Sequence, residues 1–212
     1  MVYSGRGAAR QISDGVECLI RTIYLPQAES AIELTAKVAL IGVDGWADGG
    51  YGDWIRSKVW LSDYELIRDL VPYSKTRTHL VAKLREIAAA EASKLHHKLA
   101  AALPAFDTVI VATHVPPFVE AAWHEGKQSE PDYLPHFASR FMGDALREQV
   151  LHYGHQRVLT LCGHTHGQGA CQPEYGLRVW TGGAVYRKPS IAAVLEVSDD
   201  RIASSNPAFS DF

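Results

Sequence analysis

An apolar run, Leu159-Thr160-Leu161-Cys162, ends at Gly163 and is followed by His164-Thr165-His166-Gly167. A short apolar run bounded by glycine predicts a buried β-strand. The Gly-His-Thr-His-Gly segment then forms the loop at the carboxyl end of that strand, where open α/β folds bind ligands. Neutral imidazole is a common metal ligand, so the two histidines indicate either a metal site or a polar turn that happens to contain them.

The same arrangement occurs earlier in the chain, in Val109-Ile110-Val111-Ala112-Thr113-His114-Val115-Pro116-Pro117. Here too an apolar strand is followed by a histidine, and the two prolines exclude a helix and favour an extended chain. If the two strands are near neighbours in one sheet, their histidines meet at the same sheet edge. The candidate metal ligands are therefore His114, His164 and His166.

Together the two motifs, strand-Thr-His-x-Pro-Pro and strand-Gly-His-Thr-His, resemble the C-terminal half of the calcineurin-like metallophosphoesterases. The resemblance implies an α/β fold in four layers, a two-sheet β-sandwich flanked by helices. It implies hydrolysis of a phosphate mono- or diester with two divalent metal ions (Mn, Fe or Zn). By the resemblance, His114 and His164 are ligands of one ion and His166 is a ligand of the other. Two such ions stabilise both the attacking and the leaving oxygen at phosphorus.

The chain departs from the family's pattern at its N-terminal side. The ordered series Asp-x-His, Gly-Asp and Gly-Asn-His-Asp/Glu does not occur, and the acidic residues before position 40 stand in other contexts: Asp14, Glu17, Glu29 and Glu33. The resemblance therefore predicts a fold truncated at its N-terminal side, without the bridging carboxylate or the histidine that assists the leaving group. We expect further coding sequence upstream of Met1, or else a homodimer that covers an exposed sheet edge.

Three functions remain open at this point. The first is a metal-dependent phosphoesterase whose activity is impaired by the missing ligands. The second is a non-catalytic binding or regulatory module that retains the fold. The third is a hydrolase with a single His₃ zinc site, because three histidines can hold one catalytic zinc ion with an open fourth position.

The composition predicts one globular domain over residues 1–212, because this length buries a substantial core. A hydrophobic fraction of 47% argues against disorder, and a net charge of −3 gives no basic face for nucleic acid. The apolar runs are too short to span a bilayer, and the N-terminus has no signal-peptide core. Three scattered cysteines do not form a disulfide framework, so we expect a cytoplasmic protein. Its expected partner is a phosphorylated small molecule or a phosphodiester.

Hydrophobic periodicity and turn residues predict the remaining elements. Helices are expected at residues 10–23, at 62–70 after a Ser62-x-x-Glu65 capping box, at 78–103 and at 139–153. Besides the two motif strands, strands are expected at residues 31–35, 37–43, 170–172, 177–181 and 191–197, with another possible at 22–25. Residues 1–8 and the polar residues from 199 onward are expected to be irregular.

Two long loops contain further candidates. In residues 44–53, Asp44, Asp48 and Asp53 either face a metal or substrate or serve as turn residues beside glycine. In residues 116–137, Trp123 and His124 either line a substrate pocket, together with Phe118, or cover the open end of the sheet. Cys162 is interpreted as a buried strand residue.

Overall fold

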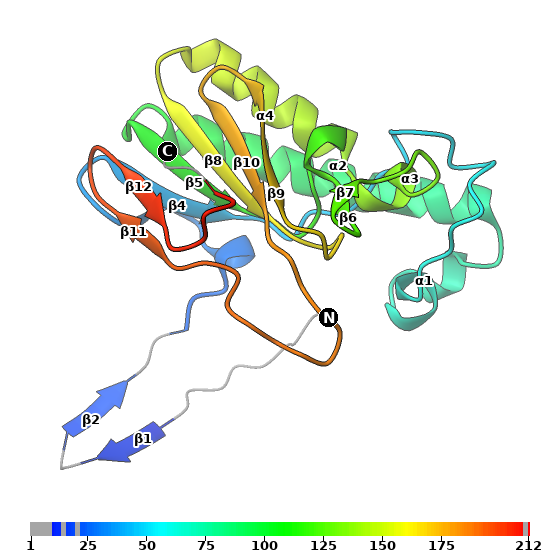
Figure 1. Ribbon diagram of the computed structural model, residues 1–212, viewed down its shortest axis with the longest axis horizontal. Coiled ribbons are helices and arrows are strands. Elements are labelled where there is room, and N and C mark those ends of the chain that lie inside the picture. Colours follow the sequence, from blue (N-terminus) through cyan, green and yellow to red (C-terminus); the bar gives the residue numbers. More distant parts are fainter. Residues whose placement is uncertain (1–9, 14–15, 20–21, 210–211) are drawn as a thin grey trace.

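A mixed six-stranded β-sheet carries two long helices on one face (Figure 1). The computed structural model describes residues 10–13, 16–19, 22–209 and 212. The strand order is β3 (Ile32–Glu33), β4 (Val38–Gly42), β5 (Thr108–Ala112), β8 (Arg157–Cys162), β10 (Leu177–Thr181) and β9 (Gly169–Glu174). The four central strands are parallel, and β3 and β9 pair antiparallel at the two edges. The predicted α/β class and the expected neighbourhood of the two motif strands are confirmed.

The two long helices begin and end close to the predicted positions. Helix α2 (Arg77–Ala102) begins after Thr76, whose side chain accepts a hydrogen bond from His79 N at 3.2 Å. Helix α4 (Arg140–Tyr153) begins after Ser139 and ends before Gly154, which has a φ of 64°. Both starts therefore satisfy a backbone N–H that the first helical turn leaves unpaired.

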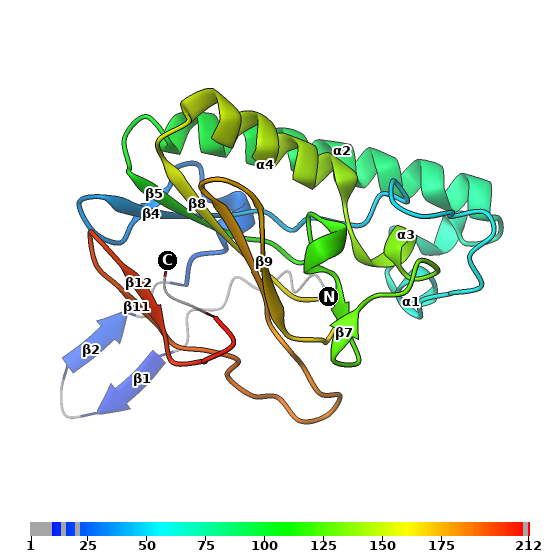
Figure 2. The same cartoon turned by 45° about the horizontal axis from the view of Figure 1, so that its top comes forward.

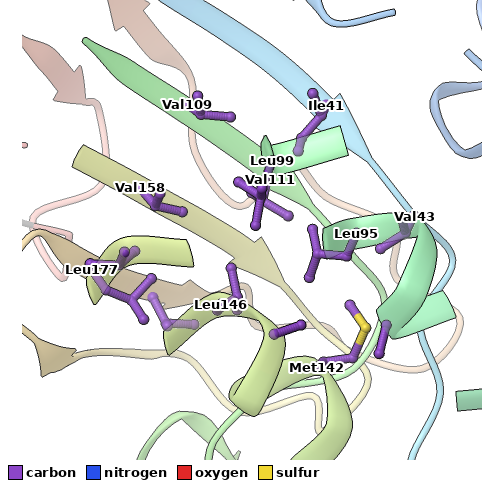
Figure 3. Packing of buried hydrophobic residues seen from close by; sticks show 14 of the residues in the cluster. Ile41, Val43, Leu95, Leu99, Val109, Val111, Met142, Leu146, Val158 and Leu177 are labelled. Atoms are coloured by element: carbon purple, nitrogen blue, oxygen red, sulfur yellow. The ribbon is translucent and has the colours of Figure 1, made fainter. Parts of the chain in front are cut away.

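The main core lies between the sheet and these helices (Figure 3). Side chains alternate between the two faces of each strand, so Val109 and Val111 of β5 point toward the helices while Ile110 points to the other face. The helices contribute Leu95 and Leu99 of α2 and Met142, Leu146 and Val150 of α4. Full burial of one such aliphatic side chain contributes roughly 1.5–3 kcal/mol.

The opposite face of the sheet is covered by the C-terminal part of the chain (Figure 2). Strands β11 (Leu195–Val197) and β12 (Ile202–Ser204) form a separate two-stranded antiparallel sheet. Ile202 packs there against the central strands, and Phe209 stacks on Trp180 of β10 with ring centroids 5.1 Å apart. The larger second sheet of the expected sandwich stays a prediction.

A smaller apolar cluster lies beyond the sheet at the N-terminal half of α2. Leu80 and Leu84 of this helix pack there with Trp54, Tyr64 and Leu70. The cluster includes the short helix α1 (Asp63–Leu66) and adjoins the 3₁₀ turn η2 (Val71–Tyr73). Helix α2 therefore links two separate cores.

The helix expected over residues 10–23 is wrong. Strands β1 (Arg10–Ser13) and β2 (Val16–Leu19) pair antiparallel instead, and residues 22–25 form no strand but lead into the 3₁₀ turn η1 (Leu25–Gln27). The sequence carries a signal for this outcome, because Asp14-Gly15 is a typical hairpin-turn dipeptide between two short runs that contain β-branched residues. The expectation of an irregular segment at residues 1–8 lies outside the described residues.

The prediction of a capping box at the start of α1 is also wrong. Ser62 makes no capping hydrogen bond with its side chain, and Glu65 instead accepts a hydrogen bond from Trp60 Nε1 at 3.0 Å. The helix also ends at Leu66 rather than near Leu70, because the backbone at Ile67 is extended.

The loop and tail predictions need smaller corrections. Residues 116–137 contain the 3₁₀ turn η3 (Val119–Ala121), the hairpin of β6 (Trp123–His124) and β7 (Lys127–Gln128), and the helix α3 (Leu134–Phe137). The strand expected at 191–197 is limited to its last three residues, and β12 lies within the expected polar tail. Within the described part of the chain, no helix is long and apolar enough to cross a membrane.

Candidate metal centre

The histidine motifs lie at the carboxyl ends of neighbouring parallel strands. His114 follows β5, and His164 follows β8, which pairs with β5. The backbone ties these exits together, because His114 N donates to Asp44 O at 2.9 Å and Gly163 N donates to His114 O at 3.0 Å. Three segments that are far apart in sequence therefore meet at one edge of the sheet, where ligands bind in this class of fold.

His114 and His164 contact each other directly. His164 Nδ1 lies 3.1 Å from His114 Nε2, and His164 Nε2 lies 3.2 Å from the carbonyl oxygen of His136. A carbonyl oxygen only accepts, so His164 Nε2 carries the proton and donates it. His164 Nδ1 consequently has a free lone pair, which faces the His114 ring.

Both imidazoles favour the neutral form. Burial is the main cause, and the neighbouring His114 the second, of a pKa of His164 that is lowered to about 4. The pKa of His114 is also lowered, chiefly by desolvation, although this ring keeps access to solvent. Near pH 7 both rings therefore offer the neutral form that binds metal ions.

The histidine loop has a strained backbone. His164 and His166 have φ values of 66° and 63°, in the left-handed region that residues other than glycine rarely adopt. Strain of this kind gathers at functional sites, where the surrounding structure enforces it. Here Trp123 O accepts a hydrogen bond from Gly167 N at 3.0 Å, and a Cβ added at Gly167 would lie 2.3 Å from that oxygen. Only glycine therefore allows the loop to approach β6 so closely.

Trp46 contributes an aromatic surface to the histidine pair. Its ring stacks on His114 at 5.6 Å with an interplanar angle of 15°, and it meets His164 at 5.4 Å and 58°. Phe137 contacts the His164 ring edge to face at 5.6 Å. No pattern in the sequence indicates this contact between Trp46 and the histidines.

His136 was also missed, although its carbonyl holds His164. Its imidazole is fully buried, with Nε2 lying 2.9 Å from Ser57 Oγ and Nδ1 lying 2.7 Å from Tyr64 Oη. Ser57 donates its hydroxyl hydrogen to Asp132 O, so His136 Nε2 donates to Ser57 and Nδ1 accepts from Tyr64. Burial lowers the pKa of His136 to about 4. The only sequence signal was a histidine between proline and phenylalanine, which indicates no partner.

His166 has different surroundings from the other two candidate ligands. Its carbonyl accepts a hydrogen bond from Ala184 N at 3.1 Å, and its ring meets Tyr186 at 4.5 Å. It also borders a hollow of about 410 Å³ between Glu125 and the residues around Ile191. Among the residues that the structure describes, no three His, Cys, Asp or Glu side chains gather to hold a metal ion.

The donor set fits one metal ion in part. The 3.1 Å between the two facing nitrogens is close to the roughly 3.3 Å that separates two ligands of a tetrahedral site with metal–nitrogen bonds of about 2.05 Å. The hydrogen bond from His164 Nε2 to the backbone carbonyl of His136 is of the kind that orients the rings of metal-bound histidines. Of the three candidate ligands, His114 and His164 are therefore brought together in an arrangement that would suit two ligands of one ion, and the described residues form no complete two-metal centre of the kind that the resemblance implies.

Trp123 and His124 support the histidine loop from outside. Trp123 packs on Gly167 and Gly169, and His124 Nδ1 lies 3.0 Å from Thr165 O. The hollow beside His166 is bordered by Glu125 and Gly126 rather than by these two residues. A contact of Trp123 or His124 with substrate stays a prediction.

Two of the three aspartates of residues 44–53 have structural roles, Asp48 in joining the loop to α4 and Asp53 in a local turn. Asp48 is buried and accepts hydrogen bonds from Phe141 N at 2.8 Å and from Ser139 Oγ at 3.2 Å, at the start of α4. Asp53 accepts from the backbone N–H groups of the turn that follows it. The carboxylate of Asp44 accepts a hydrogen bond from the Tyr24 hydroxyl.

Cys162 is a buried strand residue, as interpreted from the sequence. Its thiol lies 3.4 Å from Thr181 Oγ1, and burial raises its pKa to about 12. The thiol form is therefore the stable one at neutral pH, which does not favour metal binding.

Comparison with known proteins identifies a similarity in structure. No protein-family model matches the chain, and no curated protein matches it in sequence. Among solved structures, the chain matches a dimetal phosphatase from Danio rerio with a TM-score of 0.48 and 16% sequence identity. The match covers 86% of this chain and 58% of that protein. At this identity the similarity concerns the overall fold alone.

Proposed function

We propose that this chain binds a divalent metal ion (Mn, Fe or Zn) through His114 and His164 and acts on a phosphate mono- or diester. The observation that carries the proposal is the pair of imidazole nitrogens 3.1 Å apart, presented by the ends of two neighbouring strands. The two sequence motifs that contain these histidines resemble those of the metallophosphoesterases, which supports the same function. By that resemblance β11 and β12 belong to the second sheet of the sandwich.

Each residue has a distinct role in the proposed site. His114 Nε2 and His164 Nδ1 provide the lone pairs, and the His136 carbonyl fixes the tautomer of His164. His114 Nε2 must release its proton to bind an ion, since it faces the His164 lone pair. The bound ion would act as a Lewis acid toward the phosphoryl oxygens and would activate water. His166 is proposed as a ligand of a second ion.

We expect the chain by itself to be a slow phosphoesterase, because the family's Asp-x-His and Gly-Asn-His motifs are missing from its sequence. With p-nitrophenyl phosphate or its bis ester and added Mn²⁺, turnover should lie below the range of roughly 1–10³ s⁻¹ that is usual for enzymes. Turnover within that range would show that other residues complete the site.

The test is metal affinity, measured by titration calorimetry and by the metal content of dialysed protein. His114→Ala and His164→Ala should each weaken Zn²⁺ or Mn²⁺ binding by at least about tenfold, since even outer-sphere substitutions cost that much. His97→Ala is the matched control, because His97 is an exposed histidine on α2. Equal affinity of wild type and His114→Ala would refute the proposal. Metal binding without any hydrolysis would instead favour the non-catalytic binding module.

A further inference from the structure

Trp46 is positioned against both candidate metal ligands, although it lies on a loop and carries no metal-binding atom. Its indole covers His114 in a nearly parallel stack and meets His164 at a steep angle. One aromatic ring is thus shared by two imidazoles that come from different strands. An aromatic surface in contact with two rings restricts the orientations of both.

The backbone around Trp46 is fixed by the sheet edge. Gly45 has a φ of 69°, and a Cβ added there would lie 2.3 Å from Thr113 Oγ1. Asp44 N donates to Glu91 Oε2 of α2 at 3.0 Å, while Asp44 O accepts from His114 N. The loop that carries Trp46 is therefore joined by hydrogen bonds both to helix α2 and to the segment that contains His114. Trp46 does not sit on a freely moving loop.

The indole N–H makes no contribution that explains this placement. Trp46 Nε1 is buried and has no hydrogen-bond partner among the described residues. A buried donor without a partner is unfavourable, so a tryptophan chosen only for stability would not be expected here. The flat surface of the ring, and not its polar atom, makes the contacts with the histidines.

We propose that Trp46 is a positioning residue of the metal site, one that holds the His114 and His164 rings with their nitrogens facing each other. This inference rests on the proposed function, because it assigns Trp46 to the same pair of ligands. Without the ring, the solvent-exposed His114 side chain gains rotamers in which Nε2 points away from His164. Binding of an ion would then have to fix the two imidazole rings, and the free-energy cost of this ordering would lower the metal affinity.

The first experiment examines the histidine pair in metal-free protein by NMR. A ring stacked on His114 shifts the His114 ring protons through its ring current, so Trp46→Leu should move those resonances toward ordinary values and weaken the cross-peaks between His114 and His164. Trp46→Phe should largely preserve both observations, because it keeps a smaller aromatic ring in the same position, and the indole N–H that it removes has no hydrogen-bond partner among the described residues. Trp60→Leu is the matched control, since Trp60 is a partly exposed tryptophan whose Nε1 donates to Glu65.

The second experiment measures metal binding by tryptophan fluorescence with Co²⁺, which quenches nearby indoles. Titration of wild type and of Trp60→Phe should show quenching, and Trp46→Phe should lose most of it while binding Co²⁺ with an affinity within about threefold of wild type. Trp46→Leu should bind Co²⁺ roughly tenfold more weakly, the effect expected of residues that orient metal ligands. Circular dichroism and urea unfolding identify any variant that fails to fold, and the Phe variant then still tests the proximity of Trp46.

The outcomes separate this inference from the proposed function. Unchanged His114 resonances in Trp46→Leu, or equal Co²⁺ affinity of that variant and wild type, would overturn the role of Trp46 even if metal binding stands. Failure of wild type to bind Co²⁺, with the NMR result as expected, would overturn the metal site and leave Trp46 as the residue that orders the histidine pair. Quenching that persists in Trp46→Phe would also contradict the inference.

Discussion

The buried His136 should make the stability of this protein depend on pH in a way that one substitution can isolate. In the folded state its pKa is about 4, compared with the ordinary value of 6.5. Because the pKa of His136 is lower in the folded state, this group contributes to the free energy of unfolding above pH 6.5. That contribution is lost as the pH falls toward 4, because the unfolded chain binds the proton at a higher pH than the folded protein does. From pH 7 to pH 5 the free energy of unfolding should fall by about 2 kcal/mol on account of this group alone.

Urea unfolding in EDTA at pH 7, 6 and 5 measures this contribution. His164 also has a depressed pKa, so the wild-type loss should exceed the contribution of His136 alone. His136→Gln keeps a polar side chain without the titration, and its loss between pH 7 and pH 5 should be smaller than that of wild type by about 2 kcal/mol. His97→Gln, on the surface of α2, serves as the control and should retain the wild-type loss. The same pH dependence in wild type and in His136→Gln would refute the argument that burial keeps this histidine neutral.

Two further pairs of substitutions test the core and the histidine loop. Leu146→Ala should cost about 2–5 kcal/mol in urea unfolding because this α4 side chain is fully buried, whereas Leu151→Ala, on the exposed side of the same helix, should stay within about 0.5 kcal/mol of wild type. Gly167→Ala should weaken Zn²⁺ binding and lower stability, since its Cβ would meet Trp123 O at 2.3 Å, whereas Gly163→Ala meets nothing within 4 Å. If Gly167→Ala and Gly163→Ala both bind Zn²⁺ like wild type, the close approach of the histidine loop to β6 does not position the histidines.

The parts of the site that could be predicted from sequence are those that a local pattern encodes. An apolar run followed by histidine specifies both the strand and the position of the side chain at its end, so the placement of His114 and His164 after β5 and β8 was predicted correctly. Their proximity also followed, because parallel strands that are neighbours share a carboxyl edge. The long helices were predicted well because period and terminating residues agree, as in α2 with Pro104 just beyond its end.

The parts that were missed depend on contacts between distant segments. His136 reaches His164 from 28 residues away, and no spacing in the sequence indicates that contact. Trp46 lies in a loop rich in Gly and Asp, where turn residues dominate the pattern and no spacing links the indole to the histidines. The prediction of a helix at residues 10–23 was wrong for a different reason. The apolar residues there recur at helical spacing, and this pattern was given more weight than the turn-forming dipeptide Asp14-Gly15 within it.

Helix α2 has a consequence for how the molecule opens locally. Its 26 residues extend about 39 Å, much farther than the five residues of β5 beneath it. The C-terminal half is held by the main core, and the N-terminal half by the cluster around Trp54 and Tyr64. Amide protons along one continuous helix should therefore exchange with solvent in two groups. Those near Leu80 become accessible when the small cluster opens, and those near Leu99 only when the sheet itself unfolds.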